Sequence, residues 1–219
     1  GVGDLPRVAR VRAVPTRRRR APFGRGRPQC GENGHMSQPP AADPALDPET
    51  LHELPPDANI SRSRAVELRE QIRTAQDDTA ELLARGDLVE LLRINRELDE
   101  ALTEAERAAN RAEMAGTAAQ QHLARVRLAH VRQWRGEFAE SNLIFTELLN
   151  ASTQFGPVVE AFTLERAGKN DYDQGHFDDA CAHFRRALEI REKLELADEI
   201  EASRLALHAA TRRRQGGEP

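Results

Sequence analysis

Between residues 61 and 115, apolar positions recur at alternating steps of three and four residues, separated by polar and charged positions. This spacing places the apolar side chains on one face of a helix. One helix is predicted over residues 62–85, with Gly86 ending it. A second is predicted from Asp87, with Glu90 as its capping-box partner. Because both stretches keep the alternating steps, residues 61–115 are predicted to form a long antiparallel hairpin with heptad seams.

Asn95 is the polar residue within the second of these seams, where it would set the register of the pairing. Because apolar heptad seams can pair between chains, self-association through the hairpin is also predicted. The alternative is that residues 61–115 form one more ordinary helix pair, which differs from the hairpin mainly in length.

A second pattern is a glycine followed by two phenylalanines that are seven residues apart, and it occurs twice at an interval of 39 residues. The interval is typical of helical repeat arrays. Residues 116–214 are therefore predicted to form helix pairs with a terminal helix. Thr117 and Gln120 form a capping box at the start, and Pro157 suits a first helical position. The whole chain is predicted to be all-α, with about seven antiparallel helices.

The second copy resembles the tetratricopeptide repeat family. Its small residues stand where two helices approach closely, its glycine allows a tight turn, and its aromatic residues fill the space between helices. The residues that carry the resemblance in this copy are Leu164, Ala167, Gly168, Tyr172, Gly175, Phe177, Ala180, Phe184, Ala187 and Leu188. The first copy matches at Gly136, Phe138 and Phe145. The resemblance covers about residues 120–194. It implies a concave groove, lined by the first helix of each pair, that binds a peptide or helix of a partner protein.

Helical positions that point inward from the first helices predict which residues line this groove. The chain has one Trp and one Tyr, and both fall among them, as is typical of binding surfaces. The predicted groove residues are Arg127, His130, Trp134, Glu165, Lys169, Tyr172 and Arg213. The alternative interpretation is that Trp134 closes the core at a turn and that the charged residues only face solvent.

Both ends of the chain lack a helical period. Residues 1–60 are predicted to be a disordered tail, first Arg-rich and then Pro-rich, and residues 215–219 a disordered C-terminus. Arg17–Arg20 suggest a targeting or nucleic-acid patch. The alternative is that residues 1–35 are translated upstream sequence, because Met36 begins a more ordinary stretch.

Charge changes this picture only slightly. Residues 1–35 hold nine arginines against Asp4 and Glu32, so the remainder of a chain with net charge −4 is clearly acidic. An acidic folded part makes a nucleic-acid partner improbable. No apolar run is long enough for a membrane helix. The only cysteines, Cys30 and Cys181, are badly placed for a structural disulfide, which favours a reducing, cytoplasmic location.

Chemical motifs give no reason to expect an enzyme. The seven histidines show no zinc-ligand spacing, so no metal and no cofactor are predicted. Cys181 lies within a predicted helix and is interpreted as a small buried residue. The favoured function is a non-catalytic scaffold or adaptor that binds a protein or peptide partner. Two alternatives are a nucleic-acid-associated regulator that uses the Arg-rich tail, and a regulator that senses a peptide or small molecule.

Overall fold

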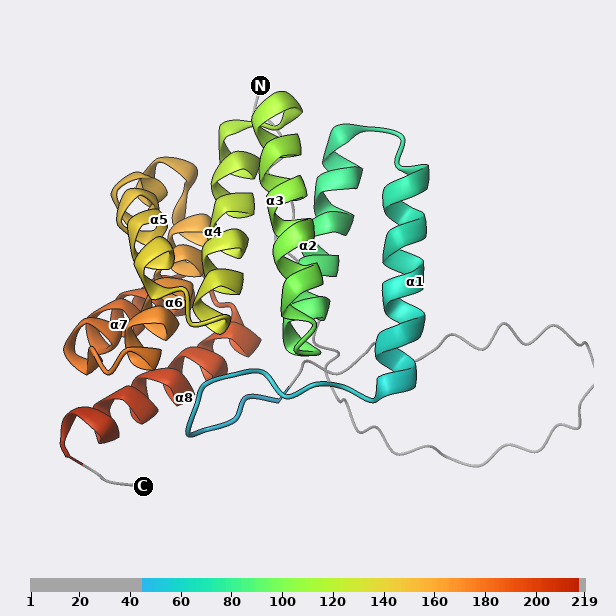
Figure 1. Cartoon of the computed structure of the whole chain (residues 1–219). Coiled ribbons are helices and arrows are strands. Elements are labelled where there is room, and N and C mark those ends of the chain that lie inside the picture. The colour runs from blue at the N-terminus through green and yellow to red at the C-terminus, as the bar shows by residue number, and fades with distance from the viewer. Residues whose placement is uncertain (1–44, 217–219) are drawn as a thin grey trace, which may run out of the picture.

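The computed structural model describes residues 45–216, apart from the side chain of Asp198, and consists of helices (Figure 1). Within this range the only β-type pairing is an isolated bridge between Leu46 and Glu53. The all-α prediction is therefore confirmed, with eight α-helices in place of about seven. The helices are α1 (Ala58–Thr74), α2 (Asp78–Ile94), α3 (Leu98–Ala115), α4 (Ala118–Trp134), α5 (Phe138–Ala151), α6 (Pro157–Asp173), α7 (Phe177–Lys193) and α8 (Ala197–Arg214), with a 3-10 turn η1 (Ser152–Phe155).

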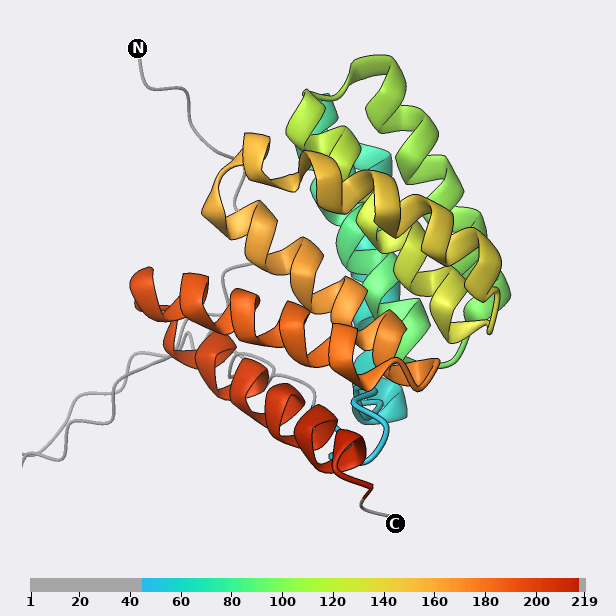
Figure 2. The same ribbon diagram turned by 90° about the vertical axis from the view of Figure 1, so that its left-hand side faces the viewer.

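Each helix packs against the helix that follows it in the sequence, so the chain zigzags through the array (Figures 1 and 2). A second set of contacts joins every other helix: α2 touches α4, α4 touches α6, and α6 touches α8. These four helices therefore share one side of the array, whereas α3, α5 and α7 are their partners within each pair.

The predicted long hairpin of residues 61–115 is wrong, because this region forms three helices of 17 or 18 residues. The first break comes before Asp77, whose side chain accepts a hydrogen bond from the Ala80 N–H and caps α2. The second break follows Asn95, which is the C-cap of α2 and not a residue of a helical seam. Gly86, predicted to end a helix, lies inside α2. The apolar steps continue across both breaks, and for this reason the sequence pattern concealed them.

The repeat extends further than the two glycine–phenylalanine copies indicate. A residue with left-handed backbone ends the first helix of each pair: Arg96 (φ 66°), Gly136 (φ 76°), Gly175 (φ 79°) and Gly216 (φ 80°). The intervals between them are 40, 39 and 41 residues. The pairs are thus α2–α3, α4–α5 and α6–α7, with α8 as an unpaired first helix. Arginine replaces glycine at residue 96, and this replacement hid the first copy.

The small and aromatic residues of the repeated pattern pack between the helices. Phe145, Phe184, Ala180 and Ala187 are buried, and Phe138 and Phe177 are partly buried. Gly168 allows the closest approach, because a Cβ placed there would lie 2.7 Å from Cε1 of Phe184. The capping box of Thr117 and Gln120 and the proline at the start of α6 are also confirmed.

The expectation of disorder up to residue 60 does not hold for residues 45–60, of which residues 58–60 belong to α1. Asp47 folds a turn by accepting hydrogen bonds from the N–H groups of Glu49 and Thr50. The bridge between Leu46 and Glu53 closes it, and Asp57 caps α1. Figure 1 shows this segment in blue, between α8 and the start of α1. The rest of the predicted tail, including Arg17–Arg20 and Cys30, and residues 217–219 lie outside the described residues.

None of the helices between residues 45 and 216 combines the length with the apolar composition that a membrane span requires.

Candidate functional site

The repeat places polar side chains at equivalent positions on the shared side of α2, α4 and α6. The positions are counted back from the left-handed residue that ends each helix, which is Arg96 in α2, Gly136 in α4 and Gly175 in α6. Three residues before it stand Arg93, Gln133 and Tyr172; six before it, Glu90, His130 and Lys169; nine before it, Asp87, Arg127 and Arg166. Most of these side chains are buried, although helices of a repeat array usually bury apolar residues at such depth. We call this set the polar face.

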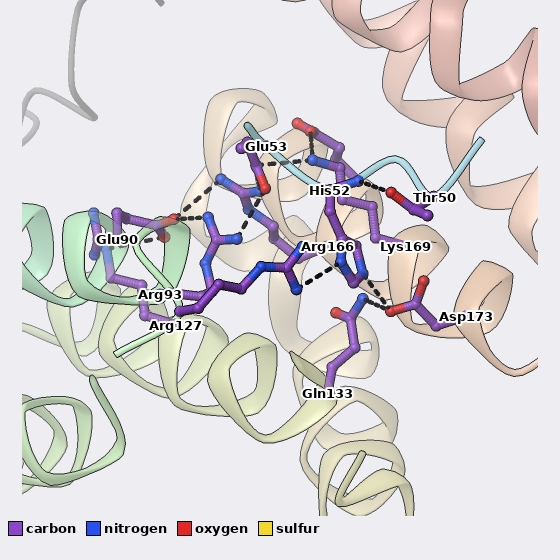
Figure 3. A network of polar contacts seen from close by, with 12 residues as sticks. Thr50, His52, Glu53, Glu90, Arg93, Arg127, Gln133, Arg166, Lys169 and Asp173 are labelled. Carbon is purple, nitrogen blue, oxygen red and sulfur yellow. Dashed lines mark hydrogen bonds and ion pairs between the residues drawn. The ribbon is translucent and has the colours of Figure 1, made fainter. Parts of the chain in front are cut away.

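The polar face is buried because residues 49–53 of the same chain lie over it (Figure 3). Glu53 is at the centre. Its carboxylate accepts hydrogen bonds from Nη1 of Arg93 at 2.8 Å, Nη1 of Arg166 at 2.9 Å and Nζ of Lys169 at 3.0 Å. We call these three cations with Glu53 the carboxylate site. It joins α2, α6 and the segment, three parts of the chain that are far apart in the sequence.

The charge state of Glu53 follows from this site. Only 7% of the residue is exposed, and burial alone would raise its pKa. The positive charges of Lys169, Arg93 and Arg166 outweigh burial and hold the pKa well below the usual carboxyl value. Glu53 is therefore ionised at neutral pH and bound as a carboxylate.

His52 is held beside the carboxylate site by stacking and hydrogen bonding. Its ring lies on the indole of Trp134, with centroids 4.3 Å apart and an interplanar angle of 18°. Arg96 approaches Nδ1 of His52 at 3.3 Å. Because a guanidinium can only donate, Nδ1 is the acceptor, and Nε2 carries the proton that it donates to Asp173 at 3.0 Å. Gln133 donates to the same carboxylate oxygen at 2.9 Å.

Leu51, in the middle of the segment, fills a separate apolar site. It is 1% exposed and is part of a cluster formed by α6, α7 and α8. Next to it, the hydroxyl of Tyr172 donates to the main-chain carbonyl of Glu49 at 2.7 Å. We call this the leucine site; its members from the helices are Tyr172, Ala180, Cys181, Phe184, Ala206, Ala209 and Ala210. Cys181 is buried there as a small apolar side chain.

A second ion pair stabilises the α6 side of the polar face. Glu165 accepts one hydrogen bond from Arg191 of α7, and its Oε1 lies 3.4 Å from Nζ of Lys169. Burial raises the pKa of Glu165, but Arg191, Lys169 and Arg166 together lower it far below the usual range. Arg191 also donates to the hydroxyl of Ser203, which connects α7 to α8. Lys169 is thereby fixed by Glu165 and points its ammonium group at Glu53.

Five cations lie at or beside the polar face with side chains at most 13% exposed: Arg93, Arg127, Arg166, Lys169 and Arg191. Among the described residues, their ion pairs within the helices reach only two carboxylates, Glu90 and Glu165. Glu53 supplies the third. A buried cation without a carboxylate costs several kcal/mol, so this face requires an anionic group from outside the helices.

The predicted groove residues are distributed as follows. Lys169, Trp134 and Tyr172 contact residues 49–53, and Glu165 fixes Lys169. Nε of Arg127 lies 3.9 Å from Oε1 of Glu90, a residue of α2. His130 lies beneath the carboxylate site, and burial together with Arg93 and Arg166 keeps its pKa well below the usual histidine value. Arg213 is apart from the segment and lies over the ring of Phe177.

The sequence analysis did not identify five residues of the candidate site: Leu51, His52, Glu53, Arg93 and Arg166. Arg93 and Arg166 have the same repeat offsets as the predicted groove residues Tyr172 and Arg127. Recognition of residue 96 as a turn would have found Arg93, and the offset from Gly175 would have found Arg166. The segment itself carries no periodic signal, because a short non-helical peptide buries only single side chains.

Comparison with protein-family models, with curated proteins and with solved structures finds no match for the chain.

Proposed function

We propose that this protein is a non-catalytic adaptor that binds a short peptide of a partner protein across α2, α4, α6 and α8. One observation carries the proposal: these helices already hold a short non-helical peptide, residues 49–53, through side-chain and main-chain contacts that a separate peptide could also make. The turn geometry shared by Arg96, Gly136, Gly175 and Gly216 supports assignment to a tetratricopeptide-like array, in which peptide binding is the common role.

The contacts to the segment are of the kinds that give peptide recognition its affinity and specificity. The leucine site removes an aliphatic side chain from water, which contributes about 1.5–3 kcal/mol. The carboxylate site supplies three charge-assisted hydrogen bonds, which are stronger than neutral ones. Tyr172 binds a main-chain carbonyl and so accepts many sequences at that position.

The arrangement of charge supports binding over catalysis. Glu53 is saturated by cations, and Glu165 is fixed by Arg191 and Lys169, so neither carboxylate is placed to exchange protons. The buried His130 is held neutral by its surroundings. Groups locked in ion pairs hold a ligand in position, whereas a general acid or base needs a pKa near the working pH.

Charge reversal at Lys169 tests the proposal. In the full chain, Lys169→Glu should abolish binding of a fluorescein-labelled peptide with the sequence of residues 45–56, measured by fluorescence anisotropy. The matched control is Lys193→Glu, because Lys193 is the other lysine of the chain and is exposed on α7. A folded Lys169→Glu variant that binds the peptide as well as the Lys193→Glu variant would refute the proposed function.

A further inference from the structure

The segment that covers the polar face is a strained and incomplete ligand. Leu51 has φ 57°, a left-handed conformation that is sterically unfavourable for a non-glycine residue. Its burial in the leucine site compensates for this strain. The side chains of Leu51 and Glu53 are therefore the main anchors of the segment, and its backbone is not relaxed.

Beneath the segment, buried polar atoms remain without hydrogen bonds. Both ring nitrogens of His130, Oε1 of Gln133 and Nε1 of Trp134 have no partner among the described residues. These residues are 0%, 1% and 7% exposed, respectively. Each buried polar group without a partner destabilises the covered state, because it has lost its hydrogen bonds to water. A ligand that reaches these atoms with its own polar groups would bind the same face more tightly than residues 49–53 do.

We propose that residues 49–53 are a built-in competitor for the binding face, and that the partner displaces them with a segment of the same chemistry. This inference rests on the proposed function. The partner segment carries a leucine followed, two residues later, by a glutamate or aspartate. Its leucine enters the leucine site, and its carboxylate takes the place of Glu53 between Arg93, Arg166 and Lys169.

Two observations favour a peptide over a polyanion such as single-stranded nucleic acid. The leucine site is lined by apolar side chains and would leave a phosphate or sugar without partners. The carboxylate site provides for one anionic group, because Glu90 and Glu165 already pair with the neighbouring cations. A chain of phosphates would meet these two carboxylates at close range and be repelled.

Covalent attachment gives the segment a strong advantage over a free peptide. Only residues 54–57 separate it from α1, so its effective concentration at the face is in the millimolar range expected for a short linker. A free peptide that binds the open face with a micromolar Kd is therefore weakened by roughly 100-fold or more in the wild-type chain. Release of the segment is the step at which binding would be regulated.

The test compares two double variants of the full chain with the labelled peptide of residues 45–56. Leu51→Ser/Glu53→Gln removes both anchoring side chains. Leu54→Ser/Glu49→Gln makes the same chemical changes at exposed positions, one within the segment and one directly after it. We expect the first variant to bind at least tenfold more tightly than wild type, with no change in the second. Acrylamide quenching of Trp134 should increase in the first variant and fall again when the peptide is added.

The outcomes separate the two proposals. If both folded double variants bind the peptide with wild-type affinity, and Lys169→Glu abolishes this binding, the face binds peptides but the segment does not compete. If no folded variant binds the peptide, the proposed function also fails. If a twelve-residue oligothymidylate binds the opened face in place of the peptide, the partner class is wrong.

A measurement on the wild-type chain covers the case in which the first double variant does not fold. An excess of the free peptide should accelerate hydrogen exchange of the chain's own residues 45–54. The amides of Leu51 and Leu54 donate to the carbonyls of Asp47 and Ala45 within the turn, and displacement removes the contacts with the helices that hold this turn folded. A control peptide that carries serine in place of Leu51 and glutamine in place of Glu53 should not accelerate this exchange. Equal exchange with both peptides, or no acceleration with either, would overturn the inference.

Discussion

The imidazole of His52 lies flat on the indole of Trp134, 4.3 Å from centroid to centroid. Trp134 is the only tryptophan of the chain. Its fluorescence therefore reports directly on whether residues 49–53 cover the polar face, with no introduced label.

We expect His52→Ala to increase acrylamide quenching of Trp134 and to lower the free energy of unfolding by about 1 kcal/mol, the usual value of an aromatic pair. His208→Ala is the control, because His208 is exposed on α8. Quenching that is identical in the two variants would mean that His52 does not shield Trp134 in solution.

Acid should release the segment through Glu53. The pKa of Glu53 is held well below the usual carboxyl value, so its ion pairs are intact above that value. They are lost as the pH falls through the lowered pKa. We expect a rise in Trp134 quenching in this acidic range, and Glu53→Gln should lack it while showing higher quenching already at neutral pH. An unchanged acidic rise in Glu53→Gln would assign the release to other groups.

His122 should make stability depend on pH in a higher range. Burial lowers its pKa from 6.5 to about 4, and Arg125 adds to the effect. The unfolded chain therefore takes up the proton first, and the free energy of unfolding falls between about pH 6.5 and pH 4, by roughly 3 kcal/mol for this residue. Denaturant titrations across this range should show a smaller loss for His122→Gln than for wild type.

His122→Gln is suited to this comparison because of the hydrogen bond that His122 makes. The hydroxyl of Thr163 donates to the carbonyl of Val159 at 2.8 Å, so its oxygen accepts from Nε2 of His122 at 2.9 Å. A glutamine amide can donate in the same way but does not titrate. Equal pH dependence in the two proteins would exclude His122 as the cause.

Asn95 distinguishes the observed turn from the predicted heptad seam. Ser61, which is buried, donates to Oδ1 of Asn95 at 3.0 Å. Asn95→Leu should leave this hydroxyl without a partner and cost about 1–3 kcal/mol. A seam position would give the opposite sign, because a leucine there adds apolar packing. Asn95→Asp keeps the acceptor oxygen, and its thermal melt should stay closer to wild type.

Glu195 is the left-handed residue between α7 and α8, with φ 56°, and its side chain is exposed. Glu195→Gly should raise the free energy of unfolding by about 0.5–1 kcal/mol, because glycine adopts this conformation without the steric cost. Glu195→Ala removes the same side chain but keeps a Cβ, so it should give no gain. A comparable gain from alanine would attribute the effect to the lost charge.

The sequence by itself determined the features that depend on neighbours along the chain. The helices from Thr117 onward were predictable because capping boxes, helix-starting proline and apolar spacing act over a few residues. Phe145 and Phe184 could be placed in the core because they repeat at the interval of Gly136 and Gly175. The same local signals failed at Arg96, because a left-handed arginine depends on what surrounds it.

Only the tertiary structure decided which residues form the candidate site. Glu53 meets Arg166 and Lys169 across more than one hundred residues of sequence, and Tyr172 is as far from Glu49. No periodicity links a short non-helical segment to the helices that it covers. Its position depends on whether three cations and an apolar cluster come together in the folded array to accept one carboxylate and one leucine. Local sequence patterns therefore predict the helices. The position of residues 49–53 depends on charge and shape that exist only after the helices have packed.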